Sequence, residues 1–164
     1  MYRLFFSISA LALYAALTGC SRQTSVWVRE GSSADSLVFE LGWERGRAVP
    51  VAMGFIRVDR CEALRASPGV IPPVSQAAWV LEGIPQQAVD ISSVRYGAAV
   101  RGYRTLQPPA VLDRPGCYVA AISGGGETAF EIDPSGRSTE VDPAALTLPG
   151  ISPAPAPHPR NPSP

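Results

Sequence analysis

Short apolar runs separated by turn signals extend from Thr24 to about Val141. Within Leu37–Trp43 the apolar side chains occupy every second position, which is typical of a strand with one buried face. The other runs extend this pattern to about seven short strands, and Pro68 would end a helical turn near Glu62–Ala66. The predicted strands cover residues 26–28, 37–43, 51–59, 78–82, 89–96, 117–123 and 129–133.

About seven short strands spaced by glycine and proline predict an all-β sandwich over residues 25–143. A domain of ~120 residues is large enough to enclose one hydrophobic core. Large aromatic side chains contribute most to such a core. Its expected large members are Trp27, Phe39, Trp43, Phe55, Trp79 and Phe130.

The N-terminal segment has the pattern of an export signal. Arg3 precedes an apolar stretch of 14 residues from Leu4 to Leu17, which is shorter than the ~18–20 residues of a membrane-spanning helix. The stretch ends in Leu17-Thr18-Gly19-Cys20, which resembles the lipobox of bacterial lipoproteins. The resemblance implies a signal peptide over residues 1–19, cleavage before Cys20, a diacylglyceryl thioether on Cys20 and acylation of the new terminus. The alternative is an ordinary secretory signal with an incidental cysteine.

Lipidation of Cys20 would anchor the mature chain to a membrane, because two acyl chains suffice for stable attachment. In the lipoproteins that the motif resembles, Ser21 rather than aspartate after the cysteine favours the outer membrane. Residues 20–24 form a short tether with a reach of less than about 20 Å. The domain is therefore expected close to the membrane, facing the periplasm or exposed at the surface.

Once Cys20 is assigned to lipid, Cys61 and Cys117 remain as one pair. In an oxidising envelope compartment a disulfide is the default, and it would close a loop of 56 residues. The chain-entropy relation gives roughly 4 kcal/mol of stabilisation for a loop of this size. The alternatives are a metal-binding pair or a reactive thiol, but no Cys-x-x-Cys spacing or neighbouring histidine supports them.

A second resemblance concerns the segment Leu112-Asp113-Arg114-Pro115-Gly116-Cys117-Tyr118-Val119. It is similar to the entry into strand F of fibronectin type III and related immunoglobulin-like domains. One residue separates Gly116 from Tyr118 here, where those domains have two. The resemblance implies an immunoglobulin-like or fibronectin-III-like sandwich with Tyr118 as a corner tyrosine that bonds to the backbone upstream.

The C-terminal residues 144–164 differ from the rest of the chain. Seven prolines fall within residues 147–164, so this tail cannot build a core and favours the polyproline II conformation. It is either an unstructured end or a ligand for a groove that recognises proline-rich segments. The only histidine, His158, lies in this tail. The folded domain therefore cannot contain a Ser-His-Asp triad, a Cys-His dyad or a histidine-ligated metal site.

The charge pattern excludes some partners. The chain has 14 basic and 14 acidic side chains, and this zero net charge argues against a nucleic-acid-binding protein. No metal site and no cofactor are expected, since neither an aspartate-rich calcium loop nor a phosphate-binding motif occurs. Carboxylates that a hydrolase could use are scattered, and nothing in the sequence pairs any two of them. They are Glu40, Glu44, Glu62, Glu82, Glu127 and Glu131.

Two segments are candidate binding sites. The first is the glycine-rich stretch at residues 123–127, which either joins two strands or presents a ligand-binding loop; its candidate residues are Gly124, Gly125, Gly126 and Glu127. The second interleaves arginine with tyrosine at Arg95, Tyr96, Arg101, Tyr103 and Arg104. These side chains could bind cell-wall carboxylates, lipid headgroups or an acidic partner, or they could form a solvated strand face with half-buried tyrosines.

Taken together, these patterns favour a non-catalytic envelope lipoprotein that binds or scaffolds a protein or cell-wall partner. One alternative is a lipoprotein that inhibits a lytic enzyme or protease, with the stretch at 123–127 as its inhibitory loop. A second alternative is a hydrolase that works with carboxylates and arginine alone.

Overall fold

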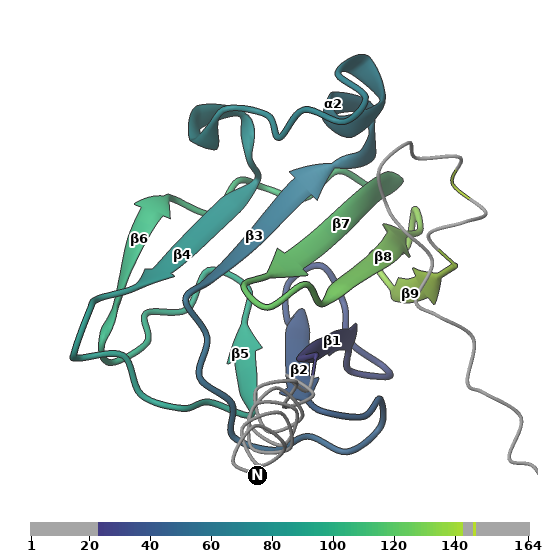
Figure 1. The fold of residues 1–164 in the computed structure, drawn as a ribbon. Helices are drawn as coiled ribbons and strands as arrows, with labels where there is room; N and C mark the ends of the chain where they lie inside the picture. Colours follow the sequence, from purple (N-terminus) through teal and green to yellow (C-terminus); the bar gives the residue numbers. More distant parts are fainter. Residues whose placement is uncertain (1–22, 143–145, 147–164) are drawn as a thin grey trace, which may run out of the picture.

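The chain folds into two antiparallel β-sheets packed face to face. The computed structural model describes residues 23–142 and residue 146 (Figure 1). The smaller sheet has the strand order β1-β2-β5 and contains β1 (Ser25–Val28), β2 (Val38–Gly42) and β5 (Ser93–Arg95). The larger sheet has the order β6-β4-β3-β7-β8-β9 and contains β3 (Phe55–Arg60), β4 (Trp79–Gly83), β6 (Tyr103–Gln107), β7 (Gly116–Ile122), β8 (Glu127–Ile132) and β9 (Ser138–Val141).

The prediction of an all-β sandwich is confirmed, although the described chain has nine strands rather than about seven. The two additional strands, β6 and β9, form the two edges of the larger sheet. The strand predicted from Val51 begins only at Phe55. Val51 itself makes an isolated bridge to Ile91, in the connection between β4 and β5.

Alternation along the strands directs one face of each sheet into a common core. In β3, Ile56 and Val58 are fully buried in this core. The ring of Phe39 from the smaller sheet packs edge-on against Phe130 from the larger sheet, with centroids 5.8 Å apart. Trp79 is also fully buried, and its Nε1 has no hydrogen-bond partner among residues 23–142 and 146. Burial of these apolar side chains between the sheets is the main stabilising contribution to the fold.

Two aromatic residues expected in the core are exposed instead. Trp43 is 41% exposed because β2 ends at Gly42, so the alternation that buries Phe39 and Leu41 no longer applies to Trp43. Phe55 is 39% exposed because it lies on the outer face of β3, opposite the face that carries Ile56. The prediction of core positions for Trp43 and Phe55 was wrong. Phe55 instead forms part of the outer surface of the larger sheet.

Two short helices lie beside the larger sheet, on the face away from the smaller one. They are α2 (Cys61–Ala66), which continues directly from β3, and the 3₁₀-helix η1 (Val74–Gln76), which precedes β4 (Figure 1). The predicted disulfide is confirmed: Cys61 at the start of α2 is bonded to Cys117 on β7, with a Cα–Cα distance of 5.4 Å. The disulfide therefore attaches α2 to a strand that is distant in sequence.

The segment that resembles strand F forms β7 and the turn before it. The hydroxyl oxygen of Tyr118 accepts a hydrogen bond from the backbone N–H of Asp113 at 2.6 Å. This is the kind of contact that a corner tyrosine makes. The predicted signal peptide, the lipidation site Cys20 with Ser21, and the tail from residue 147 lie outside the described residues.

Candidate functional site

An apolar groove of about 530 Å³ lies on the outer face of the larger sheet. Its floor consists of outward-facing side chains of β3, β4, β6, β7 and β8, and its wall is α2 with the connection to η1. Ala121, which has a small side chain, is part of this floor. The size and the mostly apolar lining are those of a ligand site.

The strand register fixes the arrangement of the floor. Val80, Arg57, Ala121 and Glu127 are successive cross-strand partners on β4, β3, β7 and β8, so their side chains form one row across the sheet. Phe55 and Glu82 form a second row toward one end of the strands. Asp59, Val119 and Ala129 form a third row toward the other end, where α2 lies. The first row therefore alternates apolar and charged side chains across the sheet.

A buried ion pair occupies the base of the groove. The guanidinium of Arg57 donates two hydrogen bonds to the carboxylate of Asp59, at 2.5 and 2.7 Å. Its Nη2 also donates to the backbone carbonyl of Pro72 at 2.6 Å. The side chains of the pair are only 10% and 8% exposed, so solvent screens this interaction little. Arg57 thus holds the connection between α2 and η1 against the sheet.

The disulfide holds the other end of the same wall. Cys61 is fully buried and packs with Val119 and Ala129 in a small second cluster, against which Leu64 of α2 also packs. Leu64 and Val119 also line the groove. The wall is therefore fixed at α2 by a covalent bond and at Pro72 by Arg57, so the groove is formed before any ligand arrives.

The exposed apolar surface of the protein is concentrated at this groove. Among the described residues, five of the eight exposed large hydrophobic side chains line it. Ile71 and Val70 are the most exposed of the five, at 79% and 62%. A cluster of this kind marks an interaction surface, whereas single exposed apolar residues need no explanation. The five are Phe55, Val70, Ile71, Val74 and Leu106.

Besides Asp59, two carboxylates lie along the groove, and they differ in their partners. Glu82 is paired with Arg104 of β6, whose Nε donates to it at 2.7 Å. The carboxylate of Glu127 receives no hydrogen bond and no ion pair from any other described residue. Glu127 is exposed at the start of β8, but partial desolvation beside the groove raises the pKa of its carboxyl above the ordinary value. Glu127 is thus an uncompensated negative charge beside apolar surface.

The glycine-rich stretch turns the chain between β7 and β8, at the end opposite α2. The carbonyl oxygen of Gly125 accepts a hydrogen bond from the side-chain amide of Gln23 at 2.9 Å. Gly126 lies so close to the backbone of Thr24 that a Cβ would sit 2.3 Å from its carbonyl oxygen. Gly124 and Gly125 have positive φ angles of 95° and 89°, which glycine adopts without strain. These contacts join the turn to the N-terminal end of the domain.

The structure divides the predicted arginine and tyrosine cluster. Tyr103 is buried, and its hydroxyl donates to the carbonyl of Val89 at 2.8 Å. Arg95 on β5, Arg101 before β6 and Arg104 on β6 are exposed, and Arg104 borders the groove through its pair with Glu82. Of the predicted binding residues, only Arg104 and Glu127 therefore come near the groove.

Tyr96 is the other tyrosine of this cluster, and it is half-buried within the fold. Its hydroxyl lies 2.8 and 2.9 Å from the carbonyl oxygens of Ala78 and Ala110, which share its single proton, and its ring packs edge-on against Trp79. Burial, with the nearby Tyr118, raises the pKa of Tyr96 to about 12. The Tyr96 hydroxyl is thus held within the protein rather than offered to a ligand.

The raised pKa of Tyr96 predicts a loss of stability in alkali. Because the folded pKa lies above the ordinary value of 10.0, folding favours the neutral hydroxyl, and this contribution is complete below pH 10. It is lost as the pH rises from 10 toward 12, by about 1 kcal/mol at pH 11. Urea unfolding at pH 8 and pH 11 measures this loss. Tyr96→Phe should show a smaller difference between the two pH values, and an equal difference would contradict the assignment.

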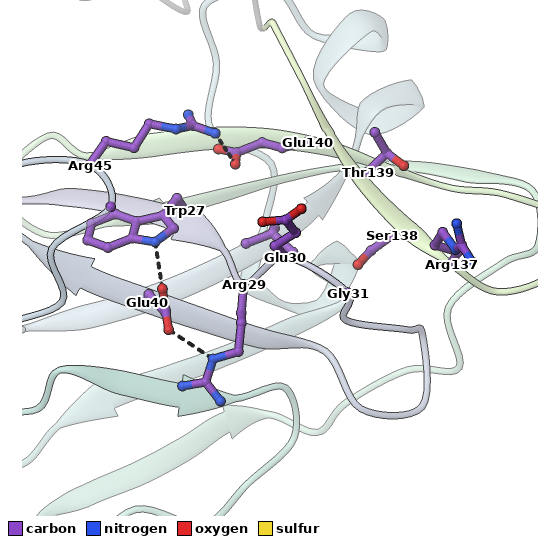
Figure 2. Close-up of a pocket in the computed structure, with 12 residues that line it drawn as sticks. Trp27, Arg29, Glu30, Gly31, Glu40, Arg45, Arg137, Ser138, Thr139 and Glu140 are labelled. Carbon is purple, nitrogen blue, oxygen red and sulfur yellow. Dashed lines mark hydrogen bonds and ion pairs between the residues drawn. The ribbon is translucent and has the colours of Figure 1, made fainter.

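A second, polar hollow of about 810 Å³ lies where β1 of one sheet meets β9 of the other (Figure 2). The carboxylate of Glu40 accepts hydrogen bonds from Trp27 Nε1 and from Arg29 Nε, each at 2.8 Å. The bond from Arg29 holds the pKa of Glu40 below its ordinary value, and that from Trp27 adds to the effect. Arg45 is paired with Glu140, on the other side of the hollow in Figure 2.

The charges of this polar hollow thus largely compensate one another. Glu140 also accepts a hydrogen bond from the hydroxyl of Thr128, so both of its oxygens have partners. The lowered pKa of Glu40 is the reverse of what a general acid needs at neutral pH. The pair between Arg45 and Glu140 connects the chain after β2 to β9, which is an edge strand of the larger sheet. Its role is therefore structural.

Apart from Glu127, the residues that line the apolar groove were not predicted from the sequence as binding residues. One signal for them exists: Val70 and Ile71 are consecutive apolar residues within a connection rich in proline and glycine, where polar residues are usual. Within the described part of the chain, no helix is long and apolar enough to cross a membrane, and no three histidine, cysteine or acidic side chains gather as metal ligands would.

The apolar groove is the best candidate for a functional site, since it gathers exposed hydrophobic side chains and one carboxylate that has no partner among the described residues. No protein-family model, no curated protein and no solved structure matches this chain.

Proposed function

We propose that this chain is a membrane-anchored lipoprotein of the bacterial cell envelope whose sandwich is a non-catalytic binding module. The proposal for the anchor rests on the lipobox Leu17-Thr18-Gly19-Cys20. The proposal for binding rests on the apolar groove, which gathers five exposed hydrophobic side chains on one face. The outer membrane is the proposed location, and an envelope protein or cell-wall component is the proposed partner.

The position of the N-terminal end supports a role close to the membrane. Gln23, three residues after Cys20, is hydrogen-bonded to the turn between β7 and β8. Three residues span at most about 11 Å, so this end of the sandwich would face the lipid. The groove extends from this end, where Phe55 and Glu82 lie, toward α2 at the other. A bound partner would therefore lie beside the membrane surface.

Rigidity of the groove wall supports binding rather than simple exposure of apolar residues. The wall is held by the disulfide at Cys61 and by the bond from Arg57 to Pro72. A groove fixed in this way loses little conformational entropy when a ligand binds, which favours affinity.

Site-specific crosslinking in cells tests this proposal. A photoreactive amino acid at position 71 of the full chain should crosslink one discrete envelope component. The same amino acid at position 111 should not, because Val111 is as exposed as Ile71 but lies outside the groove. The crosslinked band should weaken when Leu106→Ser removes an apolar side chain from the floor.

The same strain set tests the anchor. Cys20→Ser should release the protein from the membrane fraction and abolish incorporation of labelled palmitate. Equal crosslinking from positions 71 and 111 would contradict binding through the groove, and unchanged membrane attachment of Cys20→Ser would contradict lipidation.

A further inference from the structure

The groove also indicates the chemistry of its occupant. We infer that it binds an extended peptide segment of a partner protein in which apolar side chains flank a lysine or arginine, and that Glu127 is the counter-ion of this cation. The inference rests on the proposed function, because it names the ligand of the same groove. Three observations support it: the division of the floor, the sign of the uncompensated charge and the distribution of apolar side chains around it.

The floor is divided in a way that suits a peptide better than a lipid acyl chain. An acyl chain needs one continuous apolar channel, but Arg57 and Asp59 on β3 separate the apolar side chains of β4 from those of β7. The apolar positions that remain are separate: Phe55 at one end, Val80 and Leu106 on one side, Val119 and Ala121 on the other, and the wall of α2. Separate apolar positions accept alternate side chains of an extended peptide.

The charge of the groove favours a cation from outside. Among the charged side chains that line it, Arg57 is bonded to Asp59, and Glu82 is paired with Arg104. Glu127 is two strands away from Arg57 in the same row, or roughly 10 Å at the usual spacing of strands. Among the carboxylates that line the groove, Glu127 is thus the one without a cationic partner, and it lies too far from Arg57 to form an ion pair with it.

An anionic headgroup or a fatty-acid carboxylate in this position would be repelled by Glu127, whereas a lysine or arginine would be attracted. The apolar lining beside the exposed Glu127 removes part of the solvation of its carboxylate, and the raised pKa of this group reflects the partial desolvation. A cation that bonds to Glu127 would compensate for the lost solvation. The apolar surroundings therefore increase the discrimination between cationic and anionic ligands.

A peptide array with purified full-length protein tests the inference. The array carries nonapeptides with alternating leucine or valine, each made in three versions with arginine, glutamine or glutamate at one central position. We expect the arginine versions to bind about fivefold more strongly than their glutamate versions at low salt. Glu127→Gln should abolish this difference and retain binding of the apolar peptides.

Glu131→Gln is the matched control, because Glu131 lies on the same strand and the same face as Glu127 but outside the groove. This variant should discriminate between the peptides as the wild type does. Ile71→Ser should weaken all versions alike, since Ile71 contributes apolar surface and no charge.

The possible failures are distinguishable. Apolar peptides bound without any preference for arginine would overturn the role of Glu127 and leave the groove as a binding site. Binding that is unaffected by Ile71→Ser would overturn the groove itself. A spot carrying residues 147–164 of this chain that binds more strongly than every arginine peptide would assign the groove to the protein's own tail. Binding of the unacylated Cys20→Ser protein to phosphatidylglycerol vesicles, lost on Ile71→Ser, would assign the groove to lipid.

Discussion

Replacing Arg57 with methionine should lower the free energy of unfolding by about 3–5 kcal/mol. The substitution leaves the buried carboxylate of Asp59 without its two hydrogen bonds, and the carbonyl of Pro72 without its donor. Loss of one partner from a buried ion pair is costly because the remaining charge is neither solvated nor compensated. Guanidinium unfolding with the disulfide intact measures the change.

The double variant Arg57→Met with Asp59→Leu distinguishes the cost of an unpaired buried charge from the cost of altered side-chain packing. Apolar residues of similar size can replace a buried pair with little net loss, so the double variant should recover most of the stability. It cannot restore the bond to Pro72, so ligand binding in the groove should stay weaker than in the wild type. A single variant as stable as the wild type would show that Arg57 and Asp59 do not form a buried pair in solution.

Removal of the disulfide by Cys61→Ala with Cys117→Ala should have the other large effect. The bond closes a loop of 56 residues, for which the chain-entropy relation predicts roughly 4 kcal/mol. For a domain of this size such a loss corresponds to a fall in Tm of about 15 °C. Thermal unfolding followed by circular dichroism measures it, and reduction of the wild type should give a similar shift.

The disulfide also has a local effect that distinguishes it from a general loss of stability. Cys61 begins α2, and Leu64 of the same helix lines the groove. At a temperature where the double variant remains folded, hydrogen exchange in residues 61–73 should increase more than in β8. Uniform exchange throughout the domain would show that α2 does not depend on the bond.

The strands that the sequence predicted are those in which alternation coincides with burial. β7 and β8 each have one face in the core, so buried apolar residues recur at every second position, as at Tyr118, Ala120 and Ile122 in β7. β6 and β9 were not predicted because they are edge strands with few buried positions. Of β6 only Tyr103 is buried, and of β9 only Ser138. The pairing of such strands depends on backbone hydrogen bonds to one neighbour, which leave little pattern in the side chains.

The groove was harder to predict than the sheets because it depends on what covers the outer face. Alternation places Arg57 and Asp59 on one side of β3, but the sequence does not reveal that the connection after α2 returns over them. Glu127 was a candidate on account of the neighbouring glycines, and the structure places it on β8 beside the groove. Long-range packing, which a single sequence does not encode locally, decides both cases.

The three tryptophans lie in three different environments, which gives the domain an internal optical reporter. Trp79 is sealed in the core beside Tyr96, Trp27 is bonded to Glu40 at the polar hollow, and Trp43 is exposed beyond the end of β2. Acrylamide should therefore quench emission from Trp43 first, and emission from Trp79 only when the two sheets separate. Intrinsic fluorescence thus distinguishes fraying at one edge from opening of the whole sandwich, without any added label.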